Sequence, residues 1–183
     1  MKTKSFITSI LIITILFSCK KDEKSSEETI IEDTIKKNEF FSVNLKLQFP
    51  LNDSFVAYYT EDNTINFDEN KAVWLEVKGS NEFQEITFNF KEEVIPTHLR
   101  LDFGINKDQK EVVLEKIKID FYGNNFEIRG SDFLNYFNEN KSIKTEIDQV
   151  NGSIKFIQNE DTFNPILFYP NEKLVEEIAK ITK

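Results

Sequence analysis

Residues 43–50 read VNLKLQFP, in which apolar and polar side chains alternate until the proline. The side chains that would point to one side of an extended chain are all apolar: Val43, Leu45, Leu47 and Phe49. A period of two is typical of a β-strand that is buried on one face only. Pro50 ends the stretch because it has no backbone N–H to donate to a neighbouring strand. These residues therefore predict a half-buried strand.

The same alternation recurs along the rest of the chain. Eight further stretches are candidate strands, around residues 55–59, 73–77, 86–90, 99–103, 114–121, 126–128, 154–156 and 166–168, of which 55–59 and 166–168 are continuous apolar runs. A change of phase at Glu115-Lys116 predicts a β-bulge in the longest of them. Glycine-containing pairs supply turns at Gly79-Ser80, Gly123-Asn124 and Asn151-Gly152, and the last pair suits a type I′ hairpin. The pattern predicts an all-β fold, an antiparallel, jelly-roll-like β-sandwich over residues 40–183.

Two short helices are predicted in the second half of the chain. The first has Ser131 as its N-cap, and its apolar residues are Phe133, Leu134 and Phe137. The second is C-terminal and has Asn171 as its N-cap. Its apolar residues recur with helical spacing: Leu174, Ile178 and Ile181.

Composition excludes several classes of function. The chain has 183 residues, with 32 acidic and 23 basic side chains and a net charge of −9. This balance argues against a nucleic-acid partner, because binding to phosphates needs clustered positive charge. One cysteine and one histidine allow neither an intramolecular disulfide nor a Cys/His zinc cluster. Glycine-rich phosphate loops are absent from the sequence, and no cofactor or metal is expected.

The N-terminus has the features of an export signal. Two lysines precede an uncharged, mostly apolar run over residues 6–17. This run is shorter than the roughly 20 residues that a helix needs to span a bilayer, and its place after a basic start is typical of a secretory signal. It ends in Leu16-Phe17-Ser18-Cys19, which resembles the lipobox of bacterial lipoproteins. The resemblance implies a signal peptide over residues 1–18 and acylation of Cys19. An ordinary secretory signal with a chance cysteine is the alternative.

Acylation of Cys19 would anchor the protein to a membrane without spanning it. Lys20 occupies the place of the aspartate that retains some lipoproteins at the inner membrane. The lysines and acids of residues 19–23 resemble the export signals of surface lipoproteins in some Gram-negative bacteria. These resemblances imply an outer-membrane lipoprotein, with exposure at the cell surface as one outcome. The charged residues 19–39, which lack aromatic side chains, predict a flexible spacer after the anchor.

Residues 99–104 read LRLDFG, and alternation places Arg100 and Asp102 on one face of the predicted strand. With the strands before and after it, this stretch resembles a β-sandwich module found beside bacterial cell-surface glycosyltransferases. A strand, a Leu-Arg-Leu-Asp-Pro-Gly-like turn and a second strand recur in that module, and Phe103 here replaces the usual proline. Asp161 and Asn164-Pro165 match its closing segment. The resemblance covers residues 55–168 and implies a β-sandwich.

Arg100, Asp102 and Trp74 are the predicted ligand-binding residues. An arginine and a carboxylate on one strand are suited to grip sugar hydroxyls, as in lectin-like sandwiches. The alternative is a surface salt bridge that stabilises the fold by at most about 1 kcal/mol. Trp74 could form a sugar-stacking patch with Tyr58 and Tyr59, although aromatic residues in strands commonly serve cross-strand packing.

Two further features have both a functional and a structural interpretation. Residues 62–70 place several oxygen-bearing side chains in one loop, as calcium sites require, but lack the tight-turn glycine of an EF-hand. The alternative is a solvated, Asn-rich loop. His98 could act as a general base, but no nucleophile motif accompanies it, and a residue at a strand edge is the alternative.

These observations predict a membrane-anchored envelope lipoprotein with a non-catalytic binding or accessory domain. The expected partners are the membrane, through the lipid anchor, and a glycan or an envelope protein. One alternative is a small carbohydrate-active hydrolase that uses paired carboxylates. Another is a structural envelope protein.

Overall fold

The computed structural model describes residues 40–158 and 165–183, which belong to one compact unit, Ile35–Lys183. The predicted signal peptide, Cys19 and the spacer lie outside the described residues, as do Asp161 and Asn164. Over the ranges that are described, no helix combines the length and the apolar character needed to cross a membrane.

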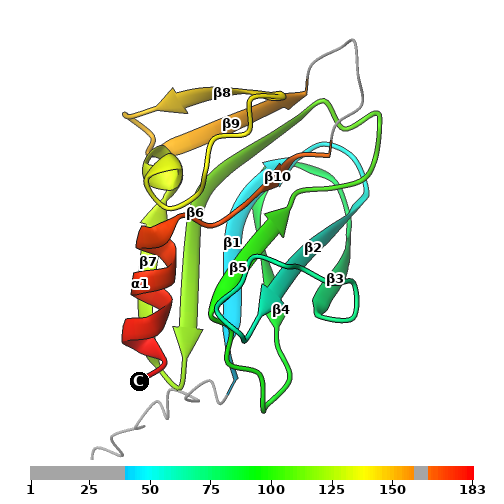
Figure 1. Ribbon diagram of the computed structural model, residues 1–183. Helices are drawn as coiled ribbons and strands as arrows, with labels where there is room; N and C mark the ends of the chain where they lie inside the picture. Colours follow the sequence, from blue (N-terminus) through cyan, green and yellow to red (C-terminus); the bar gives the residue numbers. More distant parts are fainter. Residues whose placement is uncertain (1–39, 159–164) are drawn as a thin grey trace, which may run out of the picture. The chain divides into compact units, whose positions relative to one another are not determined.

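The larger of two antiparallel sheets has six strands (Figure 1). Their order is β4-β1-β6-β9-β8, and β7 also pairs with β6. Their bounds are β1 Ser42–Phe49, β4 Ser80–Asn89, β6 Glu111–Phe121, β7 Asn124–Arg129, β8 Ile143–Asp148 and β9 Ser153–Gln158.

The smaller sheet has four strands in the order β10-β5-β2-β3 and lies in front of the larger one in Figure 1. Their bounds are β2 Asp53–Thr60, β3 Ala72–Val77, β5 His98–Asp102 and β10 Leu167–Phe168. Each pairing in both sheets is antiparallel, as the alternating sequence predicts.

Aromatic side chains fill the space between the two sheets. Phe49 of β1 packs on Phe55 of β2 with ring centroids 4.8 Å apart, and Phe103, after β5, stacks on Phe156 of β9 at 5.3 Å. All four rings are almost fully buried. Each stabilises the fold by roughly 1.5–3 kcal/mol relative to an exposed side chain. The predicted antiparallel β-sandwich is confirmed, and the phenylalanines of this part of the chain largely form its core.

The β-bulge predicted at Glu115-Lys116 is confirmed. Lys46 of β1 pairs with Lys116 and the next residue, Leu47, pairs with Leu114, so Glu115 is the extra residue. The bulge restores the inward direction of the apolar side chains on both sides of it. The Glu115 carboxylate accepts a hydrogen bond from Lys46 Nζ at 2.8 Å.

Two predicted turns differ from the structure in detail. Phe121 pairs with Asn124, and the two residues between them, Tyr122 and Gly123, both have positive φ, at 51° and 83°. This geometry defines a type I′ turn one residue earlier than predicted. The type I′ prediction at Asn151-Gly152 is wrong, because the paired residues there enclose a four-residue loop, 149–152.

The C-terminal helix is confirmed, and the cap of the first helix is wrong. Helix α1, Glu172–Ile181, begins after Asn171, whose side chain accepts a hydrogen bond from the backbone of Leu174. The first helix, η1, is a 3-10 helix over Gly130–Asn135, and Ser131 lies inside it. Its N-cap is Arg129, which makes no capping hydrogen bond through its side chain. A short 3-10 turn held by buried Phe133 forms without that cap.

Strand β8 was not among the predicted strands. Its sequence, IKTEID, has apolar residues only at its first and fifth positions, and it pairs with β9 alone. An edge strand needs less apolar surface than a central one, so its alternation is weaker.

Candidate functional site

The outer face of the smaller sheet brings the predicted binding residues together. Tyr58 of β2 lies opposite Arg100 of β5, while Val56 lies opposite both Asp102 and Trp74. Because side chains at paired positions point to the same face of a sheet, these residues share one surface. Arg100 and Asp102 on β5 and Trp74 on β3 thus lie on either side of β2, which pairs with both strands.

Arg100 and Asp102 form a bidentate ion pair. Nε donates to Oδ1 at 2.8 Å, and Nη2 donates to Oδ2 at 2.5 Å. The pair is shielded, with side-chain exposures of 18% and 9%. The hydrogen bond to Asp102 raises the pKa of Arg100, so the guanidinium stays charged. The geometry of the two residues is therefore that of a salt bridge. Each side chain neutralises the charge of the other.

Two tyrosines enclose the guanidinium group. Its Cζ atom lies 4.3 Å from the ring centroid of Tyr58 and 5.4 Å from that of Tyr169. These are cation–π distances, which stabilise the arrangement further in a shielded environment. Burial and the nearby Asp102 carboxylate raise the pKa of the Tyr58 hydroxyl, so this hydroxyl keeps its proton at neutral pH. Arg100 therefore fixes the positions of the aromatic rings around it.

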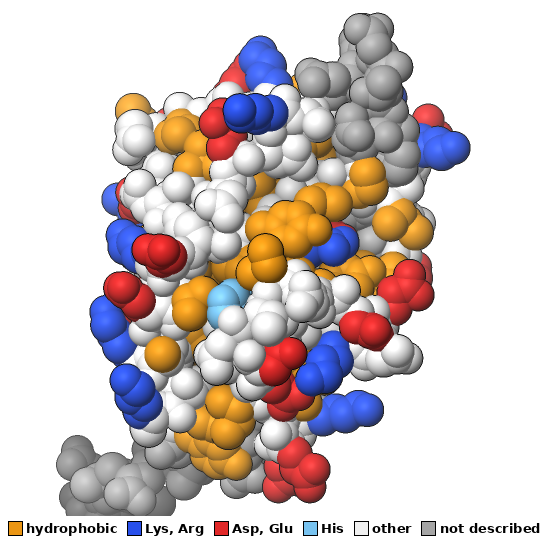
Figure 2. Space-filling view, in the orientation of Figure 1, with side chains coloured by type: hydrophobic (Ala, Val, Ile, Leu, Met, Phe, Trp, Pro, Cys, Tyr) orange, Lys and Arg blue, Asp and Glu red, His pale blue; other side chains and the backbone are white. Residues whose placement is uncertain are grey.

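An aromatic row crosses this face, and we define it by Trp74, Tyr58, Tyr169 and Phe67. Trp74 meets Tyr58 edge to face at 6.3 Å, and Tyr169 lies 5.7 Å from Phe67. Trp74 is 49% exposed and Tyr169 is 38% exposed, which leaves large ring surfaces in contact with solvent. Figure 2 shows hydrophobic side chains gathered across the middle of this face, over β10, β5 and β2.

For Tyr59 the packing alternative is confirmed, and its place in a surface patch is wrong. Tyr59 follows Tyr58 directly, so alternation turns it to the other side of β2. Its ring packs edge to face on Phe90 at 5.4 Å and belongs to the core.

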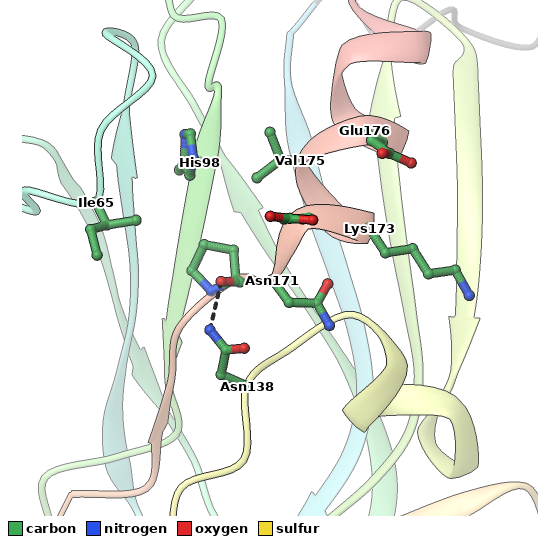
Figure 3. A pocket seen from close by; sticks show the side chains of 9 residues that line it. Ile65, His98, Asn138, Asn171, Lys173, Val175 and Glu176 are labelled. Carbon is green, nitrogen blue, oxygen red and sulfur yellow. Dashed lines mark hydrogen bonds between the residues drawn. The ribbon is translucent and has the colours of Figure 1, made fainter.

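A groove of about 870 Å³ adjoins the row at the start of β5 (Figure 3). Its apolar lining is Ile65, Pro170 and Val175, and its polar lining is His98, Asn138, Asn171, Glu172, Lys173 and Glu176. In Figure 3 the loop that carries Ile65 and the helix α1 stand on opposite sides of His98. A hollow of this size is large enough for a ligand, and the polar residues of its lining favour one that forms hydrogen bonds.

His98 contributes an uncharged ring to the groove at neutral pH. Burial lowers the pKa of His98, and the charge of Asp62 offsets this only in part. Nδ1 lies 3.2 Å from the hydroxyl of Thr97, which is its nearest described polar partner. No carboxylate contacts the ring in the described part of the chain, so the general-base interpretation gains no orienting partner from this geometry.

The loop predicted as a calcium candidate holds its oxygens in local turns. Asp62 Oδ1 accepts hydrogen bonds from the backbone and hydroxyl of Thr64, and Asp68 Oδ1 accepts two from Asn70. Lys71 also lines the hollow between these residues. Among the residues that the structure describes, no cluster of three or more His, Cys, Asp or Glu side chains is suited to a metal.

Two buried aspartates of the described residues, Asp53 and Asp102, make different hydrogen bonds. Asp102 pairs with Arg100, whereas Asp53 Oδ1 accepts backbone hydrogen bonds from Ser54, Ile105 and Asn106. The alternation along β2 and β5 places them on opposite faces of the sheet. These two carboxylates therefore do not form the facing pair that a glycoside hydrolase uses.

The outer face of the larger sheet has a different character. Four surface ion pairs cover it: Lys46–Glu115, Lys116–Glu127, Lys144–Glu146 and Lys155–Glu111. Such a charged surface is well solvated and contributes little to stability or binding. Phe83 of β4 adds an exposed aromatic ring to this charged face, 6.0 Å from Lys46 Nζ, whereas the smaller sheet carries a row of aromatic rings in mutual contact.

Tyr169 and Asn138 are residues of this region that the sequence did not indicate. Tyr169 follows a two-residue strand, and Asn138 follows the 3-10 helix. Their backbones meet through a hydrogen bond from Asn138 N to Tyr169 O at 2.9 Å. The sequence offered one indication of Tyr169. Alternation after Phe168, which points into the core, turns Tyr169 toward solvent.

The fold and this face define the protein as an antiparallel β-sandwich whose smaller sheet carries a row of aromatic rings and whose larger sheet carries surface ion pairs. Comparison of the chain with protein-family models, with curated proteins and with solved structures finds no match. Its function is therefore argued from the geometry of the aromatic face.

Proposed function

We propose that this protein is a lipid-anchored envelope protein whose β-sandwich binds a glycan without catalysis. The observation that carries the proposal is the contrast between the two outer faces. One is covered by surface ion pairs around a single exposed ring, Phe83, and the other presents Trp74 and Tyr169 in a row of aromatic rings around the Arg100–Asp102 pair. A local concentration of exposed apolar surface marks an interaction site.

Aromatic rings suit a glycan because a sugar ring has an apolar C–H face and polar edges. Tryptophan and tyrosine offer a flat apolar surface together with a polar N–H or O–H group. Trp74 packs against the ring of Tyr58, and Tyr169 packs against the guanidinium of Arg100. A ligand that stacks on them finds rings that are already ordered, which lowers the entropic cost of binding.

The lipid anchor follows from the lipobox-like Leu16-Phe17-Ser18-Cys19 and its single cysteine. With Lys20 after that cysteine, we propose an outer-membrane location. The spacer of residues 19–39 would then connect the anchor to the binding domain. The resemblance of residues 55–168 to the module beside cell-surface glycosyltransferases agrees with a ligand of the cell envelope.

Trp74 allows a direct test because it is the only tryptophan in the chain. We expect glycans selected on an array to change the tryptophan fluorescence of the intact protein. Replacing Trp74 by Ala should weaken binding about thirtyfold in calorimetry, because truncating an aromatic side chain that anchors a ligand costs about 2 kcal/mol.

Phe83→Ala is the matched control, since Phe83 is a 41% exposed aromatic residue of β4, on the larger sheet. It should leave glycan affinity and stability within about 0.5 kcal/mol of wild type. An array and calorimetry without any bound glycan would refute the proposal. If crosslinking in the envelope then captured a protein through the Trp74 face, the partner would be that protein.

A further inference from the structure

We propose that the ligand is a neutral oligosaccharide that extends from Trp74 across Tyr169 into the groove beside His98. This inference rests on the proposed glycan-binding function and specifies the length and the charge of the ligand. Two observations support it. The aromatic row is continuous with the groove, and the charges of this surface are mainly negative once Arg100 is paired with Asp102.

The row and the groove form one continuous surface. Phe67 of the row is two residues from Ile65 of the groove, and the backbone N–H of Phe67 donates to the carbonyl of Ile65 at 3.0 Å. Tyr169 of the row immediately precedes Pro170, which lines the groove. His98 is two residues from Arg100 on β5, so both point to the same face. A ligand that stacks on Tyr169 and extends toward Pro170 therefore reaches the groove.

The length of the surface sets the length of the ligand. The row crosses all four strands of the smaller sheet, from Trp74 on β3 to Tyr169 at the end of β10. Neighbouring strands lie about 4.8 Å apart, so this crossing alone spans roughly 14 Å. A single sugar ring covers only part of that distance, and the groove extends the surface further. Several linked sugars are needed to contact both ends.

The groove has the polar groups that hydroxyls require. Asn138 Nδ2 donates to the carbonyl of Pro170 at 3.0 Å, which leaves Oδ1 without a partner among the described residues. Nε2 of His98 likewise has no described partner, while Nδ1 contacts Thr97. Hydroxyl groups both donate and accept, so they can satisfy acceptors such as Asn138 Oδ1 and the carboxylate of Glu172.

The charges of this surface disfavour an anionic glycan. Glu172 and Glu176 line the groove, and the ammonium of Lys173, the one lysine that also lines it, lies 4.2 Å from the ring of Tyr136. On the row, Arg100 is neutralised by Asp102. A cation–π contact leaves the charge of Lys173 in place, so the groove carries two carboxylates and one ammonium, while the Arg100–Asp102 pair adds no net charge. A uronate or sulfate group would meet a surface with an excess of negative charge, which is unfavourable.

The test uses the intact protein and an array of neutral and uronic-acid-containing glycans of increasing length, followed by calorimetry with the soluble oligosaccharides that bind. We expect neutral chains to bind, with an affinity that rises at least about tenfold from disaccharides to longer chains. Ile65→Ala/Glu176→Ala alters the groove at two exposed side chains. It should lower the affinity for long chains to that for disaccharides.

Ile147→Ala/Glu146→Ala is the control, because it removes an apolar and an acidic side chain from β8 on the larger sheet. It should keep the dependence on chain length. Tight binding of uronic-acid chains, or equal affinity for disaccharides and longer neutral chains, would overturn this inference and leave the proposed function intact. Trp74→Ala separates the two ideas, since it should weaken the binding of short and long chains alike. Absence of binding to every glycan would overturn both.

Discussion

At the residue scale, the Arg100–Asp102 pair organises the aromatic face. The two side chains are joined by two hydrogen bonds, and the guanidinium lies between the rings of Tyr58 and Tyr169. Because a planar guanidinium binds a carboxylate at its edge and aromatic rings at its faces, arginine can make both contacts at once. A lysine at this position could not replace it.

We expect Asp102→Asn to destabilise the protein by about 1–3 kcal/mol, because it leaves a shielded charge without its counter-ion. The free energy of unfolding can be measured by urea denaturation. Glu127→Gln is the matched control, since it breaks the more exposed Lys116–Glu127 pair, whose separation is 3.4 Å. That change should cost less than about 1 kcal/mol. Equal effects of the two variants would show that shielding gives the Asp102 pair no special importance.

His98 gives a prediction with a defined sign. Burial lowers the pKa of His98 in the folded protein, whereas an unfolded chain has the ordinary value of about 6.5. The folded state therefore binds this proton less readily than the unfolded state does. Its contribution to stability is complete above about pH 6.5 and is lost as the pH falls through the folded pKa. Because His98 is the only histidine, its ring resonance can be titrated by NMR without assignment.

In that titration, a midpoint at or above the value for an unfolded chain would contradict the burial of the ring. His98→Gln should remove this part of the pH dependence of the free energy of unfolding and leave the part due to carboxylates.

At the scale of elements, the turn after β5 explains the glycine of the LRLDFG stretch. Gly104 has φ of +109°, a conformation that side chains with a Cβ rarely adopt. A Cβ built there would lie 2.1 Å from Asp53 Oδ2. The other oxygen of Asp53 accepts the backbone N–H groups of Ile105 and Asn106 at 2.7 and 2.9 Å. The hydrogen bonds of Asp53 thus connect this turn to the start of β2.

Gly104→Ala is expected to destabilise the protein by at least about 2 kcal/mol, because it combines backbone strain with a clash against the Asp53 carboxylate. Thermal and urea unfolding would measure the loss. Ile105→Ala is the control at the neighbouring position, where the side chain is 54% exposed, and it should have little effect. An unchanged stability of Gly104→Ala would mean that the turn can rearrange without Asp53.

Elements with one clearly buried face were predicted correctly from the sequence, and mostly exposed ones were not. Strand β1 and helix α1 were predicted correctly because each alternates between core and solvent with its own period. Strand β8 was missed because three of its last four side chains are exposed. The turn at Tyr122-Gly123 was displaced by one residue in the prediction because tyrosine rarely adopts positive φ, and the pairing of Phe121 with Asn124 imposes it here.

At the scale of the whole molecule, the proposed lipid anchor at Cys19 gives a prediction about membrane attachment. Replacing Cys19 by Ala removes the only thiol, and with it the proposed site of acylation. Without acyl chains the protein should move from the detergent phase to the aqueous phase in phase-partition experiments, because each buried methylene contributes about 0.8 kcal/mol to membrane affinity.

Ser25→Ala, a change in the predicted spacer, is the control for that experiment and should remain in the detergent phase. Unchanged partitioning of Cys19→Ala would refute acylation. Protease treatment of intact cells would then show which side of the membrane the domain faces.

The sequence by itself determined the strands with clear alternation, the bulge at Glu115 and the C-terminal helix, because side-chain direction is a local property of an extended or helical backbone. It also identified Arg100, Asp102 and Trp74 as residues for the surface. Only the tertiary structure decided that Trp74 shares the face of Arg100 and Asp102, that Tyr169 joins them and that a groove adjoins them. These residues are separated by up to 95 positions in the chain. Strand order brings them together, and that order is set by the burial of both apolar sheet faces in one core, which no local pattern encodes.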